Sequence, residues 1–132
     1  MSYTRRVHEF SRVCNEQLPK SPVQMTTKEI QFIKKMVNDE LDELESAETI
    51  TEQADALVDA IYYICDCAVK HGMNLDPLFE IVHSANMRKI VDGKVIRRND
   101  GKILKPNNWV DPQSALEAEI LRQSTNGSFA SK

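Results

Sequence analysis

Acidic residues crowd the stretch 38–59, which contains no lysine or arginine. Two groups of carboxylates within it recur at intervals of three and four residues, so each group lies on one side of a predicted helix. A run of this kind is often a solvated helix face, but such a face usually carries interleaved basic residues, and none occurs between Lys35 and Lys70. The first group consists of Asp39, Glu40 and Glu43, and the second of Glu52, Asp55 and Asp59.

Carboxylates at this density repel one another. Two of them about 5 Å apart repel by roughly 3 kcal/mol at an effective dielectric constant of about 20. A hard divalent cation with oxygen ligands would offset this repulsion. Mg²⁺ is the expected ion because it keeps open positions for water and phosphate, and Mn²⁺ is the alternative. The two acidic groups therefore predict a metal site.

The helices that carry these groups each have an apolar face. Glu40 lies at the edge of the apolar stripe of the first helix, so it leans toward the interior. The second helix, residues 50–70, is mostly uncharged, and we expect it to be largely buried, where carboxylates are costly unless they are paired or bind a metal. The stripe of the first helix consists of Ile30, Ile33, Val37, Leu41 and Leu44, and the apolar face of the second of Leu57, Ile61, Ile64 and Ala68.

Periodicity and capping signals predict an all-α fold, an antiparallel bundle of four main helices followed by a short C-terminal helix. Capping boxes at Thr26 and Thr49 open the second and third helices, which also offers Glu52 a structural role. Asn99-Asp100-Gly101 between apolar runs predicts a small β-hairpin or a loop excursion near residues 94–105. The five predicted helices cover, approximately, residues 3–17, 27–47, 50–70, 75–89 and 112–123.

Length and composition indicate one domain. The 132 residues, of which 41% are hydrophobic, form a single predicted domain over residues 1–123, and the polar residues 124–132 are expected to be a disordered tail. With no long apolar run and with cysteines suited to packing in a reducing compartment, we expect a cytoplasmic protein that does not contact membranes.

Basic residues dominate residues 86–105. Their lysines can reach phosphate oxygens, although a solvated hairpin is the plainer explanation. A basic block beside acidic groups in an acidic chain suits a small phosphorylated ligand better than a nucleic acid. Trp109 is a candidate for stacking on a base, with core packing as the alternative, and Phe10 is expected to face the core. The candidate substrate-binding residues are Asn86, Lys89, Lys102, Lys105 and Trp109.

Four segments together resemble the all-α NTP pyrophosphohydrolase superfamily, in its MazG-like or phosphoribosyl-ATP pyrophosphohydrolase-like branch. The resemblance covers roughly residues 5–112. In chain order, the segments are Asp39-Glu40-x-x-Glu43, Asp55-x-x-x-Asp59, His83-x-x-Asn86-Met87-x-Lys89 and Asp100-Gly101-Lys102-x-x-Lys105-Pro106.

The resemblance implies a homodimer or homotetramer that cleaves a nucleoside triphosphate to the monophosphate and pyrophosphate with Mg²⁺, in nucleotide-pool house-cleaning. It also implies that the two acidic groups bind the metal, and we take Glu40 or Glu43 as the general base. The second motif departs from the family pattern, because Ala56 stands where an acidic residue is expected. Either Asp55 substitutes for it, or Glu52 pairs with Asp55. A catalytically weak nucleotide-binding or regulatory module, or a purely structural oligomer, are the rival hypotheses.

Overall fold

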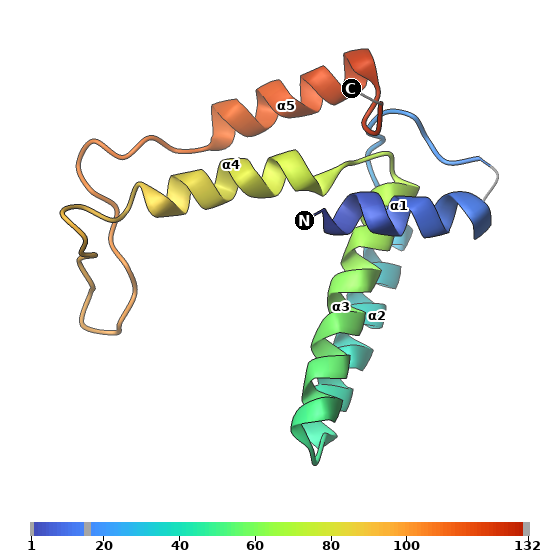
Figure 1. Ribbon diagram of the computed structural model, residues 1–132, viewed down its shortest axis with the longest axis horizontal. Helices are drawn as coiled ribbons and strands as arrows, with labels where there is room; N and C mark the ends of the chain where they lie inside the picture. The colour runs from blue at the N-terminus through green and yellow to red at the C-terminus, as the bar shows by residue number, and fades with distance from the viewer. Residues whose placement is uncertain (1, 15–16, 131–132) are drawn as a thin grey trace.

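The computed structural model describes residues 2–14 and 17–130, which form five α-helices and no strand. Figure 1 shows two helix pairs that point in different directions: α2 and α3 form one antiparallel hairpin, while α4 and α5 lie side by side. In this described part, no helix is both long and apolar enough to cross a membrane. The helices are α1 (Tyr3–Cys14), α2 (Thr27–Ser46), α3 (Ile50–Lys70), α4 (Leu75–Met87) and α5 (Gln113–Asn126).

The all-α prediction is confirmed, with two differences in detail. At 14 residues, α5 is as long as its neighbour α4, which has 13, so the division into four main helices and one short helix does not hold. The first helix ends at Cys14, earlier than predicted; Gln17 is not helical, and residues 15 and 16 lie outside the described residues.

The capping box predicted at Thr26 forms in full, while the one predicted at Thr49 forms only in its first half, because the Glu52 carboxylate bonds the Glu48 N–H in place of the Thr49 N–H. At the start of α2, Thr26 Oγ1 accepts a hydrogen bond from the Glu29 N–H, and Glu29 Oε1 accepts one from the Thr26 N–H. At the start of α3, Thr49 Oγ1 accepts from the Glu52 N–H, and Glu52 Oε1 accepts from the Glu48 N–H. These bonds satisfy amide groups that the first helical turn leaves without intrahelical partners.

The end of α3 requires a glycine. The Met73 N–H reaches the Ala68 carbonyl and the Gly72 N–H reaches the Val69 carbonyl, the pair of bonds that defines a Schellman motif. Gly72 has φ +70°, and a Cβ there would lie 2.1 Å from the Ser21 carbonyl oxygen. Any other residue would therefore push the 17–26 segment away from the end of α3.

Helix α1 joins the two helix pairs, since it contacts α3 and also α4. Asp76, in the first turn of α4, accepts hydrogen bonds from the Thr4 and Arg5 N–H groups and so caps α1 from outside. The small core beneath α1 consists of Val7, Cys65 and Val69, with Leu18 and Phe129 packed against it.

The prediction that Phe10 faces this core is wrong. Its side chain is 58% exposed and meets Tyr62 edge to face, with ring centroids 6.2 Å apart. Thr4, Val7 and Ser11 are the buried positions of α1, so Phe10 lies on the flank of the helix, over the space between α1 and α3.

Residues beyond 123, predicted as a disordered tail, contact the rest of the chain as far as they are described. Helix α5 continues to Asn126, the Ser128 hydroxyl donates to the Gly72 carbonyl, and Phe129 stacks on His8 with centroids 3.9 Å apart. Gln123, which is fully buried, exchanges two hydrogen bonds with the Asn74 backbone. These contacts attach the segment to the rest of the chain, although its polar composition predicts few buried side chains.

The prediction that α3 is largely buried is wrong for its large side chains. Its buried positions are mostly small residues, Ala56, Ala60 and Ala68 among them, which let α1 and α2 approach closely. The larger apolar residues on the other flank stay open to solvent within this chain, with exposures between 44% and 59%. This α3 flank consists of Leu57, Val58, Ile61 and Ile64.

Residues 88–112 form a loop excursion at the far end of the α4–α5 pair (Figure 1). Two isolated antiparallel bridges, Val91 with Lys94 and Arg97 with Ile103, stand where the sequence allows a hairpin, and no strand forms in this part of the described chain. Gly101, at φ +90°, makes the turn of the second bridge, as the Asn-Asp-Gly signal indicates.

Candidate active site

A cavity of about 460 Å³ lies between α1, α2 and α3 and is lined by one residue of each acidic group. Glu40 of α2 and Asp59 of α3 line it from opposite helices, and α1 closes it on the third side. The full lining consists of Phe10, Ser11, Cys14, Glu40, Asp59, Tyr62, Tyr63, Asp66 and Lys70. We call this space the carboxylate cavity.

Glu40 has the most unusual environment of the predicted site residues. Its Oε2 atom is buried and has no hydrogen-bond partner among the described residues. Burial raises the pKa of Glu40, the adjoining Glu43 carboxyl raises it further, and the charges of Asp59 and Asp55 act in the same direction. Three of the other predicted acidic residues therefore act on Glu40, which carries the unpartnered oxygen.

The chemistry of this group fits a hard cation. Carboxylate oxygens are the ligands that Mg²⁺ and Mn²⁺ prefer, and an unpartnered buried carboxylate oxygen is a costly arrangement unless something compensates it. Among the described residues, however, no three acidic, histidine or cysteine side chains converge closely enough to hold an ion as they stand. The side chains of Glu40, Glu43, Asp55 and Asp59 would have to turn toward one another to bind one.

The other two predicted acidic residues are engaged elsewhere. Asp39 forms an exposed ion pair with Lys35, with Nζ 2.9 Å from Oδ2, so the expectation that no lysine neutralises this group is wrong at that position. Glu52 accepts hydrogen bonds at the start of α3 from the Glu48 N–H and from the Thr49 hydroxyl. Both side chains would have to leave these partners to reach the carboxylate cavity.

Lys70 and Asp66 line the same cavity, although the sequence interpretation passed over both. Lys70 Nζ lies 2.8 Å from Asp66 Oδ2, and the Ser11 hydroxyl donates to Asp66 Oδ1 at 2.8 Å. Their spacing of four residues on α3 was the available signal. The pair places an ammonium group beside the carboxylates, where a phosphate could replace Asp66 as its partner.

The basic candidates gather around Trp109, far from these carboxylates. Lys89 Nζ and Lys105 Nζ lie 5.5 Å and 4.9 Å from the centre of the Trp109 ring, and the indole N–H donates to the Ala85 carbonyl at 2.6 Å. Asn86 and Lys102 are both exposed. Figure 1 shows that the cluster lies in the 88–112 excursion, away from the α2–α3 hairpin of the same chain.

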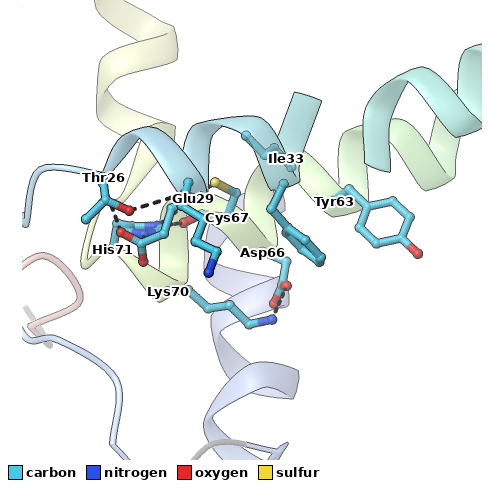
Figure 2. Close-up of a pocket in the computed structure, with 10 residues that line it drawn as sticks. Thr26, Glu29, Ile33, Tyr63, Asp66, Cys67, Lys70 and His71 are labelled. Atoms are coloured by element: carbon cyan, nitrogen blue, oxygen red, sulfur yellow. Dashed lines mark hydrogen bonds and ion pairs between the residues drawn. The ribbon is translucent and has the colours of Figure 1, made fainter. Parts of the chain in front are cut away.

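A second cavity of about 310 Å³ adjoins the carboxylate cavity at the N-terminal end of α2 (Figure 2). His71 lies at one end of it, with Nε2 2.9 Å from Glu29 Oε2 and Nδ1 2.7 Å from the Cys67 carbonyl oxygen. The ion pair thus ties the first turn of α2 to the end of α3. We call this space the Phe32 cavity, after the large side chain of α2 that helps to line it.

The Glu29 carboxylate makes stability depend on pH. The Thr26 N–H, the His71 ring and the Thr26 hydroxyl lower the pKa of Glu29 from 4.5 to about 2. Because the folded-state pKa is depressed, the ionised Glu29 and its hydrogen bonds stabilise the fold above about pH 4.5, and this contribution is lost as the pH falls toward about 2. Glu29→Gln should therefore unfold at lower urea concentration than the wild type at neutral pH, with the difference shrinking across that window.

Urea unfolding followed by circular dichroism at several pH values measures this effect. Glu80→Gln, at an exposed position of α4, is the matched control and should show no such convergence. A gap between Glu29→Gln and the wild type that stays constant from neutral pH down to about pH 2 would contradict the assignment.

The sequence matches one known protein family. The phosphoribosyl-ATP pyrophosphohydrolase family model matches residues 7–86, which include most of α1, all of α2 and α3, most of α4 and every residue of the carboxylate cavity. The chain belongs to this family. The phosphoribosyl-ATP pyrophosphohydrolase family is part of the MazG-like all-α NTP pyrophosphohydrolase superfamily, so the resemblance found in the motifs is confirmed. Comparison with curated proteins gives no significant match.

Membership in the phosphoribosyl-ATP pyrophosphohydrolase family identifies a hydrolase of the pyrophosphohydrolase type, and such proteins usually use a divalent metal. The match ends at residue 86, before the 88–112 excursion. The family assignment therefore covers the acidic residues, while the roles of Lys89, Lys102, Lys105 and Trp109 depend on the argument from the structure.

Proposed function

We propose that the protein is a Mg²⁺-dependent nucleoside triphosphate pyrophosphohydrolase that releases pyrophosphate and a nucleoside monophosphate, in the service of nucleotide-pool house-cleaning. The observation that carries the proposal is the buried, unpartnered Oε2 of Glu40 in a cavity shared with Asp59 and Lys70. Family membership supports the reaction type. Mn²⁺ is the alternative ion.

The proposed ligands are Glu40 and the three carboxylates that act on it, Glu43, Asp55 and Asp59. A bound divalent cation would supply charge neutralisation for the triphosphate and a more acidic water molecule. Glu40 is the proposed general base, because its raised pKa brings the carboxylate closer to the range in which it can accept a proton from water. Lys70 would leave Asp66 and bind a phosphate oxygen.

The 88–112 excursion, which carries Lys89, Lys102, Lys105 and Trp109, lies away from the α2–α3 hairpin of its own chain (Figure 1), so we propose that a partner subunit supplies the basic residues. The exposed α3 flank, Leu57, Val58, Ile61 and Ile64, supports an oligomer because large apolar side chains are costly in water. In a homodimer or homotetramer, the partner's excursion would bring Lys89, Lys102, Lys105 and Asn86 to the triphosphate.

The test is a nucleotide panel with product analysis. Purified protein with Mg²⁺ and each common NTP and dNTP is expected to release pyrophosphate and the matching monophosphate from at least one of them, and a chelator should abolish the release. Orthophosphate and a diphosphate as the products would contradict the assigned bond. If folded, oligomeric protein releases no pyrophosphate from any nucleotide, the proposal is wrong.

One observation favours the rival hypothesis of a catalytically weak nucleotide-binding or regulatory module. Ala56, at the position where family members typically carry an acidic residue, is only 4% exposed and faces into the helix packing. The site is therefore one carboxylate short at that position. Calorimetry that detects Mg-nucleotide binding, together with no hydrolysis in the panel, would establish this second function.

A further inference from the structure

The Phe32 cavity has no role in the hydrolysis proposed above. It lies between the first two turns of α2 and the last two turns of α3, and its volume of about 310 Å³ is in the range of small-molecule sites. Figure 2 shows the Asp66–Lys70 pair on one side of it and the Glu29–His71 pair on another. The lining consists of Thr26, Lys28, Glu29, Phe32, Ile33, Tyr63, Asp66, Cys67, Lys70 and His71.

The two cavities adjoin along α3. Tyr63, Asp66 and Lys70 line both of them, so a molecule that occupied one could extend past Lys70 into the other. The carboxylate cavity holds the groups that suit a metal-bound polyphosphate. The Phe32 cavity adjoins it within the span of one elongated ligand.

The walls of the Phe32 cavity suit a flat heterocycle. Phe32 and Tyr63 both line this cavity, and they are 61% and 37% exposed, so part of each side chain is open to a ligand. Open aromatic faces are the surfaces on which bases stack. The two pairs at its edges offer polar groups to such a ring. Lys70 and His71 carry N–H donors, and Asp66 and Glu29 carry carboxylate acceptors.

We propose that the base of the nucleotide binds in the Phe32 cavity, stacked against Phe32, while its triphosphate passes Lys70 into the carboxylate cavity. This inference rests on the proposed function, and it assigns the two ends of the substrate to two neighbouring spaces. The cavity is large enough for a one-ring or a two-ring base.

Calorimetry on the full-length protein tests the assignment with two probes that share the polyphosphate and differ in the base. One probe is a Mg-bound, uncleavable nucleoside triphosphate analogue, and the other is Mg-bound inorganic tripolyphosphate. Phe32→Ala should weaken the nucleotide about 10-fold and leave the Kd of tripolyphosphate within about twofold of the wild type. Ile33→Trp, which fills the cavity, should have the same selective effect.

Phe79→Ala is the matched control, because Phe79 is an exposed phenylalanine of α4 that lines neither cavity. Equal weakening of both probes by Phe32→Ala, or no change in either, would overturn the inference. So would a wild type that binds the nucleotide no tighter than tripolyphosphate, or a Phe32→Ala variant whose main effect is a changed oligomeric state. The hydrolysis panel reports separately on the proposed reaction, so a failure here is distinguishable from a failure there.

Discussion

Replacing Glu40 with glutamine is expected to lower pyrophosphate release by about 10²–10⁴-fold, the range that a general base contributes. The same change should raise the melting temperature at neutral pH. Burial and the Glu43 carboxyl raise the pKa of Glu40, so its ionised form destabilises the folded state at higher pH. Glutamine removes that charge, and the gain in stability should fade as the pH drops and the wild-type carboxyl becomes protonated.

A steady-state assay and thermal unfolding at several pH values measure the two effects. Glu45→Gln is the matched control, since Glu45 lies on α2 but is exposed and does not line the carboxylate cavity. Loss of activity without a gain in stability would mean that Glu40 is not strained by its neighbours. Wild-type turnover in Glu40→Gln would remove Glu40 from the site.

Mixing two inactive variants is expected to restore activity. Glu43→Gln damages the carboxylates and Lys105→Ala damages the basic cluster, and each alone should lose about 10²-fold or more in turnover. If the partner supplies the lysine, a mixed dimer has one intact site and one doubly damaged site. Random mixing of equal amounts makes about half of the dimers mixed, so activity should recover to roughly a quarter of the wild-type value.

Co-expression with two affinity tags, followed by tandem purification, isolates the mixed dimers and should bring them to about half of the wild-type activity. Glu43→Gln mixed with Glu40→Gln is the control, because both changes damage the same half of the site and no intact site can form. Mixed dimers of Glu43→Gln and Lys105→Ala that stay inactive would show that each site takes both halves from one chain.

The starts of α2 and α3 and the end of α3 were predictable because short-range chemistry determines them, whereas the predicted ends of α1 and α5 were a few residues off. The capping interactions of Thr26 and Thr49 involve residues within three positions in the sequence, and the hydrogen bonds around Gly72 at the end of α3 also join neighbouring residues. The burial of α3 was not predictable in this way. Leu57 and Ile61 have the spacing of core residues, but the structure leaves them exposed and buries the neighbouring Ala56 and Ala60. Local sequence does not distinguish an apolar helix face that packs within the chain from one that stays exposed on it.

The candidate site was predictable in part. Helical spacing placed Glu40 with Glu43 on one helix and Asp55 with Asp59 on the next, because residues three and four apart share a helix face, but it also selected Asp39 and Glu52, which have other partners. It could not show that Asp39 turns toward Lys35 instead, or that the basic loop extends away from its own carboxylates. The first depends on the rotamer of the Asp39 side chain and the second on the direction of α4, and tertiary contacts determine both.

Anomalous scattering from Mn²⁺ tests the central claim most directly, in crystals grown with an uncleavable nucleoside triphosphate analogue. The account predicts a peak in the carboxylate cavity, within ligand distance of carboxylate oxygens of Glu40 and at least two of Glu43, Asp55 and Asp59, with triphosphate oxygens on its open side. A nucleotide bound elsewhere, or bound there while these side chains keep their present conformations with no peak among them, would contradict it.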